Sequence, residues 1–267
     1  MNRAVMSNLR TLIGISGSLG GSRALADSRG LWACDCGFGS AYENYALLVP
    51  DAAVETEGLV SSGLDFFADA RSPHIWPLFP GTPERAKAML EGRGARHDDT
   101  FYGMTARLPD GLKTTRDVDA RGLWIQGPEC AGDWADAAWH GFDSGEPAPE
   151  GFVRFVSQIA LREGISLFGI RDRESGRIAA TGLLNAADGY AGVYYVSTRP
   201  EFRRTGLGVL VMRALMEKGS ELGCRRACLL ATPAGRPLYL KCGFEDSCRV
   251  AIMIHDAFAT GERRAIR

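Results

Sequence analysis

The sequence lacks net charge and long apolar runs. It carries 31 Lys and Arg against 32 Asp and Glu, a formal net charge of −1. This balance argues against general binding to nucleic acid or to a membrane surface. No uninterrupted apolar run approaches the roughly 20 residues of a membrane-spanning helix. Arg3 is followed by polar and glycine-rich sequence, unlike a secretory signal. We therefore expect a cytoplasmic protein that binds neither nucleic acid nor membrane.

A disulfide framework and metal-ligand spacing are also missing. Seven cysteines, an odd number, are scattered over 267 residues, which is typical of reduced thiols. Cys34 and Cys36 lie close together, but no second pair follows at zinc spacing, so no metal is expected. Cys224, Cys228 and Cys242 are interpreted as packing residues. The length and the 45% apolar content suit one large domain or two small ones.

The most informative stretch runs from Arg203 to Gly208, Arg-Arg-Thr-Gly-Leu-Gly. Before it, residues 193–196 (Val-Tyr-Tyr-Val) favour a buried strand. After it, apolar residues at spacings of three, four and seven predict an amphipathic helix over residues 206–222. The start of a helix offers unpaired N–H groups and the positive end of a dipole, and glycines let a ligand approach the backbone. We therefore predict a phosphate site here, reinforced by the two arginines.

A second glycine-rich segment lies near the N-terminus. Residues 11–22 favour a strand running into a glycine-serine loop, and they resemble the first loop of NADPH-dependent flavin reductases. Such a loop needs a following helix, and residues 24–29 offer only a weak one. The rest of the chain also lacks the repeated strand–helix pattern of a flavodoxin-like sheet. We interpret residues 1–40 as a loosely packed N-terminal arm. A flavin oxidoreductase remains an alternative.

The order strand, helix, strand, helix, strand occurs twice, which indicates an internal repeat. The earlier copy spans 45–49, 51–70, 74–79, 82–91 and 94–108, and the later copy spans 192–198, 206–222, 225–231, 235–241 and 244–254. Pro77 within the third segment suggests an edge strand. The earlier copy has Val49-Pro50-Asp51 in place of the arginines and glycines, so only the later copy is expected to bind an anion. The turn Pro109-Asp110-Gly111 indicates a domain boundary between them.

Residues 116–255 contain strand, two helices, three strands, helix, strand, helix and final strands. With two motifs, this order resembles the Gcn5-related N-acetyltransferase (GNAT) family. Thr198 to Gly208 matches its pyrophosphate signature, Arg/Gln-x-x-Gly-x-Gly/Ala, and Tyr239 to Phe244 matches its Tyr-x-x-x-Gly-Phe element. The resemblance implies an α/β (α+β) fold with a mixed, mostly antiparallel central sheet flanked by helices. It implies a catalytic domain over 111–267, and the repeat suggests a degenerate GNAT-like half over 41–110.

The resemblance also implies a cofactor site for acetyl-CoA. Val196, Ser197 and Thr198 would pair with the pantetheine amides through their backbone groups. The following turn would cradle the pyrophosphate through Arg203, Arg204, Thr205, Gly206, Leu207 and Gly208. Thr232 stands where some members carry an asparagine that contacts the cofactor, so Thr232 is a candidate substitute. Tyr239 matches the usual general acid, which protonates the leaving thiolate. The alternative is a core tyrosine.

The general base and the acceptor site are less defined. Family members often carry a glutamate on the central strands, but Tyr194 and Tyr195 occupy that strand here. Asp188 and Glu129 are the nearest candidates in sequence. The first two helices and their loop, which select the acceptor in the family, carry Trp134, Trp139, His140, Phe142 and Asp143. These residues suit an amine with an apolar body. Core aromatics with a surface histidine are the alternative interpretation.

The sequence thus predicts an acetyl-CoA-dependent N-acetyltransferase that acts without a covalent enzyme intermediate. The acceptor is expected to be the amine of a small molecule or an amino group of a protein, and the chain is expected to be a monomer or homodimer. A non-catalytic acyl-CoA-binding regulatory protein is the alternative, since no base is evident and the asparagine is missing.

Overall fold

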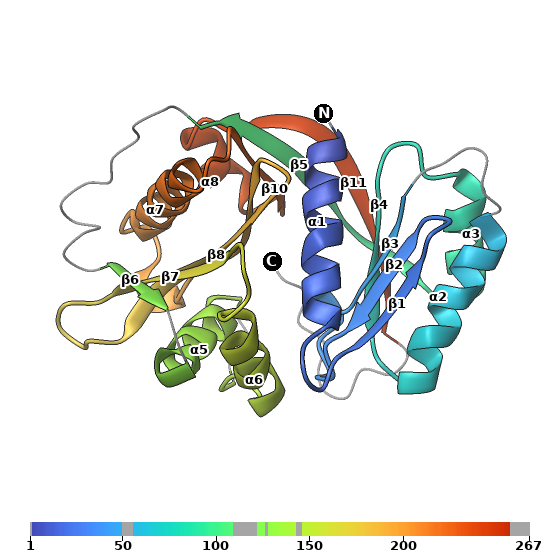
Figure 1. Ribbon diagram of the computed structural model, residues 1–267, viewed down its shortest axis with the longest axis horizontal. Coiled ribbons are helices and arrows are strands. Elements are labelled where there is room, and N and C mark those ends of the chain that lie inside the picture. Colours follow the sequence, from blue (N-terminus) through green and yellow to red (C-terminus); the bar gives the residue numbers. More distant parts are fainter. Residues whose placement is uncertain (1, 50–55, 109–121, 126–127, 143–145, 257–267) are drawn as a thin grey trace. The chain divides into compact units, whose positions relative to one another are not determined.

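The computed structural model describes residues 2–49, 56–108, 122–125, 128–142 and 146–256 (Figure 1). The chain forms two compact units. The first comprises residues up to Gly103 together with the segment from Ser247, and the second comprises Met104–Asp246. The chain therefore passes between the units within strand β5 (Arg96–Arg107) and within strand β11 (Glu245–His255).

The first unit is a sheet with helices on both faces (Figure 1). Its strands lie in the order β1-β2-β3-β4-β11-β5, with β3 and β4 parallel and β1–β2, β2–β3 and β4–β11 antiparallel. Its remaining elements are α1 (Asn2–Gly17), β1 (Arg23–Asp27), β2 (Leu31–Asp35), η1 (Ala41–Glu43), β3 (Tyr45–Leu48), α2 (Thr56–Ala70), β4 (His74–Leu78) and α3 (Glu84–Gly92).

The core of the first unit lies between the sheet and the helices α2 and α3. Apolar side chains from α2, such as Leu59 and Phe67, pack with Trp76 of β4 and Leu90 of α3, and all four are buried. A Cβ on Gly63 of α2 would lie 2.5 Å from the Trp76 ring, so glycine allows the helix to approach the indole. This packing places α2 against the sheet, where it contacts β1 and β2.

The N-terminal segment differs from the sequence prediction. Residues 11–22 do not form a strand and a glycine loop, because α1 extends to Gly17. Val5, Leu9 and Ile13 are buried at helical spacing, and α1 packs against β2. Burial of this apolar face outweighs the low helix propensity of the glycines. With the hairpin β1–β2, this helix replaces the expected loosely packed arm and removes the basis of the flavin alternative.

Strand β4 is not an edge strand, although it contains Pro77. It lies between β3 and β11, and Pro77 is opposite Ile252 of β11. The register between β3 and β4 pairs only Tyr45 with Ile75. Proline is therefore tolerated here because it lies beyond that pair, where the ladder with β3 has ended.

The second unit is also a mixed, mostly antiparallel sheet flanked by helices, as the sequence predicts. Strands β6 to β9 form antiparallel neighbours, β9 pairs in parallel with β10, and β5 follows β10. Helix α7 contacts β8 and β9, as does α5. The elements are β6 (Gly122–Ile125), η2 (Pro128–Cys130), α5 (Ala131–Gly141), α6 (Glu150–Ile159), β7 (Ile165–Arg171), β8 (Ile178–Ala187), β9 (Tyr190–Thr198), η3 (Pro200–Phe202), α7 (Leu207–Glu221), β10 (Arg226–Ala231) and α8 (Arg236–Lys241).

The order of elements in the two units is the same. Along the chain, β3, α2, β4, α3 and β5 form the earlier copy, and β9, α7, β10, α8 and β11 form the later copy, although most of β11 lies in the first unit. In each unit the first helix connects two parallel strands. Val49 precedes a part of the chain, residues 50–55, that lies outside the described residues, as does the turn Pro109-Asp110-Gly111. The interpretation of the first unit as a degenerate half therefore stays a prediction.

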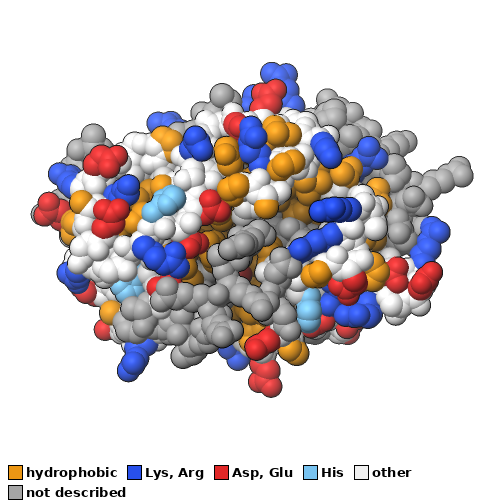
Figure 2. All heavy atoms as spheres, turned by 180° about the vertical axis from the view of Figure 1, so that it is seen from behind, with side chains coloured by type: hydrophobic (Ala, Val, Ile, Leu, Met, Phe, Trp, Pro, Cys, Tyr) orange, Lys and Arg blue, Asp and Glu red, His pale blue; other side chains and the backbone are white. Residues whose placement is uncertain are grey.

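The distribution of charged side chains on the surface and the hydropathy of the helices agree with the near-zero net charge and the lack of long apolar runs in the sequence. Acidic and basic side chains are interspersed on the face that Figure 2 shows, where no large field of one sign forms among the described residues. None of the helices in the described ranges is long and apolar enough to cross a membrane.

Candidate active site

The candidate site begins where β9 and β10 stop pairing. Their parallel register runs from Arg226↔Tyr190 to Cys228↔Gly192, whereas β9 continues against β8 as far as Thr198. The edge of residues 196–198 that faces away from β8 is therefore not paired with β10. A strand edge of this kind can pair with the amides of an extended ligand.

A β-bulge bends β9 just before this edge. Thr181 of β8 is opposite Ser197, but Leu183 is opposite Tyr194, so β9 has one extra residue. Tyr195 has a φ of 51°, which is unusual for a residue other than glycine. Thr181 stabilises the bulge, because its hydroxyl donates to the Tyr195 carbonyl at 3.0 Å and lies 2.8 Å from the Ser197 hydroxyl. The bulge thus fixes where the free edge begins.

The turn after β9 has the backbone geometry of an anion site. Arg204 and Gly206 both adopt the left-handed conformation, with φ of 64° and 85°, and α7 begins at Leu207. A turn in which left-handed residues alternate with other conformations directs successive backbone N–H groups to one side. The first N–H groups of a helix also lack intrahelical acceptors. The Leu207 side chain is buried, so only its backbone faces the turn. Gly208 allows helix α8 to come close, since a Cβ there would lie 3.1 Å from Leu238.

The polar side chains of the turn contact the protein backbone. Arg203 donates from Nε to the Thr198 carbonyl at 3.2 Å and from Nη2 to the Gly141 carbonyl at 3.0 Å. The Thr205 hydroxyl donates to the Phe202 carbonyl at 2.6 Å. Arg204 is exposed. Arg203 therefore joins the turn to the end of α5, and its charge remains beside the turn.

Tyr239 lies on α8 and is partly buried. Its ring makes an edge contact with Phe244, with 6.1 Å between centroids. Burial raises the pKa of the Tyr239 phenol, with a smaller contribution from Cys242. The phenol is therefore protonated at neutral pH, as a general acid must be. Thr232 accepts the Gly235 N–H at 3.0 Å through its hydroxyl oxygen, so it caps the turn that leads into α8.

The candidate bases are poorly placed or exposed. Asp188 lies in the turn that precedes β9, at the end of the strand opposite to Val196. A strand rises about 3.3 Å per residue, so the two are separated by more than about 20 Å. Asp188 is therefore too far from the free edge to act as a base there. Glu129 is exposed in η2.

The aromatic residues of the first two helices divide into core and partly exposed groups. Trp134 is fully buried and donates from Nε1 to the Phe168 carbonyl at 2.8 Å, so it is a core residue. Phe142 is partly exposed and lies 6.3 Å, between ring centroids, from Tyr195 at the bulge. His140 is bonded through Nδ1 to the Asp136 carbonyl at 2.8 Å. Asp143 lies outside the described residues.

The cysteines of the second unit behave as packing residues. Burial, with a contribution from Cys224, raises the pKa of the Cys228 thiol to about 12. Burial also raises the pKa of Cys224 and of Cys242. These thiols are thus protonated and weakly nucleophilic at neutral pH. No group of three His, Cys, Asp or Glu side chains with metal-binding geometry occurs within the described residues.

The structure adds a pair that the sequence does not indicate. Arg199, at the end of β9, is 3% exposed and contacts Asp136 of α5 at 2.5 Å. The two are 63 positions apart, and no motif links them. Only the place of Arg199, directly after the predicted cofactor strand, could have drawn attention to it.

Comparison with known proteins identifies the second unit. Residues 132–244 match the model of the acetyltransferase (GNAT) family. The chain carries a GNAT domain. The matched residues contain the bulged strand, the turn before α7 and Tyr239. The match of this domain to the GNAT family supports acyl-CoA-dependent N-acetyltransferase activity in general. No curated protein matches the sequence.

Solved structures share the fold of this chain over nearly its whole length. A GCN5-related N-acetyltransferase from Kribbella flavida has a TM-score of 0.63 at 19% identity, and the match covers 94% of this chain and 95% of that one. An acetyltransferase of the GNAT family from Novosphingobium aromaticivorans gives 0.57 at 16% identity, with 92% and 97% covered. A tandem GNAT protein from the clavulanic acid biosynthesis pathway gives 0.56 at 16% identity, with 93% and 87% covered.

Proposed function

We propose that the protein is an acetyl-CoA-dependent N-acetyltransferase that transfers the acetyl group directly to an amine. The acceptor is a small molecule or an amino group of a protein. The observation that carries this proposal is that an unpaired strand edge and an anion-binding turn follow one another directly in the chain. The strand edge at 196–198 leads into the left-handed turn at Arg204 and Gly206. An extended ligand with amides at one end and a pyrophosphate at the other fits this arrangement.

The cofactor roles follow from this arrangement. The backbone of Val196, Ser197 and Thr198 pairs with the pantetheine amides. The N–H groups around Gly206, Leu207 and Gly208 bind the pyrophosphate at the start of α7. Arg203 and Arg204 supply positive charge, and Arg203 also holds the turn to Thr198 and Gly141.

The reaction requires one proton donor on the leaving group. A neutral amine attacks the thioester carbonyl, the C–N bond forms, and the C–S bond breaks as the tetrahedral intermediate collapses. The amine loses a proton to solvent, the departing sulfur gains one from a protein acid, and solvent reprotonates that acid before the next turnover. Tyr239 supplies that proton, because its phenol is protonated at neutral pH and α8 lies against the start of α7 through Leu238 and Gly208. No cysteine nucleophile is required.

A thiol-release assay tests this function. Purified protein, acetyl-CoA and a panel of amines, peptides and aminoglycosides should release free thiol with at least one acceptor. Tyr239→Phe should lower kcat while the calorimetric Kd for acetyl-CoA stays near that of the wild type. An affinity loss equal to the rate loss would show that Tyr239 acts in binding.

The absence of an acid on the described part of β9 favours a second candidate, a non-catalytic acyl-CoA-binding regulatory protein. In that case acetyl-CoA binds, and no amine of the panel releases thiol. Tyr239→Phe then changes neither binding nor rate. The same two measurements therefore separate the enzyme from the regulator.

We also propose that the first unit is a degenerate GNAT-like half that binds no acyl-CoA. The shared order of elements supports the common origin, and a tandem GNAT protein is among the structures with this fold. The sequence Val49-Pro50-Asp51 lacks the arginines and glycines of the second turn. Calorimetry should give one acetyl-CoA per chain. A stoichiometry of two would contradict this assignment.

A further inference from the structure

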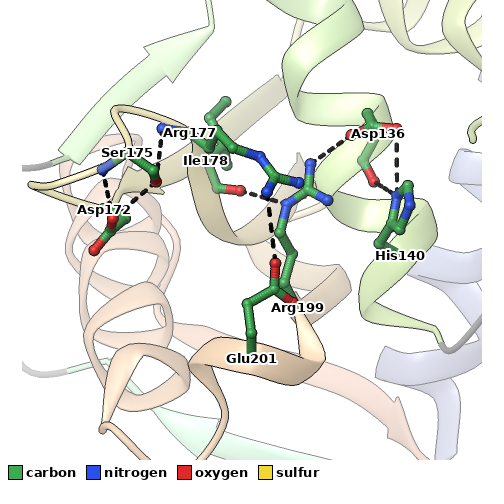
Figure 3. A network of polar contacts seen from close by, with 8 residues as sticks. All are labelled: Asp136, His140, Asp172, Ser175, Arg177, Ile178, Arg199 and Glu201. Carbon is green, nitrogen blue, oxygen red and sulfur yellow. Dashed lines mark hydrogen bonds and ion pairs between the residues drawn. The ribbon is translucent and has the colours of Figure 1, made fainter.

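Arg199 holds the end of the cofactor strand to two other elements. Its backbone N–H donates to the Ala179 carbonyl at 2.9 Å, and its Nε donates to the Ile178 carbonyl at 2.8 Å, both at the start of β8. Its Nη2 contacts Asp136 Oδ2 of α5 at 2.5 Å. Figure 3 shows the guanidinium between the Ile178 carbonyl and Asp136. The Arg199 side chain is 3% exposed and that of Asp136 is 36% exposed, so solvent reaches the ion pair only from the Asp136 side.

Asp136 connects this strand end to the first two helices and their loop. Besides Arg199, its carboxylate accepts the backbone N–H of Ala148, which lies just before α6. Its Oδ1 lies 3.3 Å from His140 Nδ1, one turn further along α5. Although burial opposes ionisation, the hydrogen bond and charge of Arg199 and the nearby His140 lower the pKa of Asp136. One carboxylate therefore contacts β9, α5 and the segment before α6.

The end of α5 is also in direct contact with β9. A Cβ on Gly141 would lie 2.3 Å from Ser197 Oγ and 3.1 Å from the Thr198 nitrogen. Glycine thus allows the helix to approach the two residues that are proposed to pair with pantetheine. The Asp136–Arg199 pair lies beside this contact, one turn before the end of α5. The spacing between α5 and the cofactor strand is fixed at these two adjacent points.

We propose that Asp136 and Arg199 are a positioning pair that aligns the acceptor amine with the thioester. The inference rests on the proposed acetyltransferase function, with α5 and α6 on the acceptor side, as the family resemblance implies, and β9 on the cofactor side. Neither residue is a catalytic residue, because neither is assigned a contact with substrate. The pair acts by holding the two sides in register, and a small misplacement of reacting groups lowers the rate by about 100-fold in other enzymes.

The variants Asp136→Asn and Arg199→Lys test the pair separately. Asparagine keeps the size of Asp136 but removes the charge that faces Arg199. Lysine keeps the charge of Arg199 but replaces its rigid fork with one ammonium, which does not reproduce the bonds to Ile178 and Asp136 together. Asp133→Asn is the matched control. Asp133 lies on the same helix, and its contact with Arg171 is an exposed 3.8 Å ion pair.

We expect Asp136→Asn to lower kcat by about 10- to 100-fold, with the Kd for acetyl-CoA changed by less than about threefold. Arg199→Lys should do the same, and the double variant should be no slower than the slower single variant, because both remove one interaction. The control should match the wild type. Thermal unfolding of each variant checks that it folds. If Arg199→Lys does not fold, Asp136→Asn alone tests the positioning role.

Three results would overturn the positioning role. These are an unchanged kcat, a Kd for acetyl-CoA that rises in step with the loss of kcat, or a double variant whose loss equals the product of the single losses. A wild-type protein that binds acetyl-CoA but acetylates no amine would instead contradict the proposed function, and the positioning role with it. Failure of the pair and failure of the function therefore give different results.

Discussion

Replacing Gly206 with aspartate tests the anion turn most sharply. Gly206 has a φ of 85°, and a Cβ built on it meets no atom within 4 Å. The new side chain therefore has room, so its effect on the ligand comes from charge and from backbone strain. Asparagine has the same shape and tolerates the left-handed conformation about as well. Gly206→Asn thus carries the strain without the charge and is the matched control.

The size of the charge effect follows from Coulomb's law. A carboxylate about 5 Å from a phosphate charge, at an effective dielectric constant of about 20, is repelled by about 3 kcal/mol. That energy corresponds to a loss of about 100-fold in affinity. The Kd of Gly206→Asp for acetyl-CoA should therefore exceed that of Gly206→Asn by about two orders of magnitude at low salt. The difference should shrink as salt is added.

Isothermal titration calorimetry with acetyl-CoA at two salt concentrations measures this difference. Circular dichroism confirms that both variants fold. Equal affinities for the aspartate and asparagine variants would refute the assignment, because no negative group of the ligand would then lie near Gly206. A difference that does not respond to salt would refute the electrostatic explanation.

Three further perturbations address other parts of the molecule. Tyr239→Phe should lower kcat by about 100-fold or more without weakening acetyl-CoA binding, measured by thiol release and calorimetry. Gly141→Ala should destabilise the second unit by about 1–3 kcal/mol in urea unfolding, because the new methyl group would overlap Ser197. Burial lowers the pKa of His74 from 6.5 to about 4, with a further effect of His255, so folding holds His74 neutral. Stability should be full above pH 6.5 and fall by about 3 kcal/mol towards pH 4, and His74→Phe should reduce this slope in urea unfolding.

The local features of the site were predictable because their patterns are strong. The apolar run at 193–196 lies within β9, and the predicted helix over 206–222 corresponds closely to α7. Both signals arise from burial of one strand or helix face, which the order of residues records directly. The GNAT motifs added what local physics lacked, namely a proposed identity for the anion and a proposed role for Tyr239.

The remaining features depend on contacts between distant residues. Helix α1 was missed because Leu9 and Ile13 are buried only when the helix packs on β2, and the glycines in the segment favour a loop. The bulge at Tyr195 depends on Thr181 in the neighbouring strand. The pairing of Asp136 with Arg199 joins two elements that no sequence period connects.

The most direct test of the proposed function is mass spectrometry of the acceptor after incubation with acetyl-CoA. We predict that the protein produces one acetylated amine for each free thiol that it releases. Thiol release without acetylated amine, or bound acetyl-CoA that remains intact with every amine of the panel, would contradict the assignment as an N-acetyltransferase.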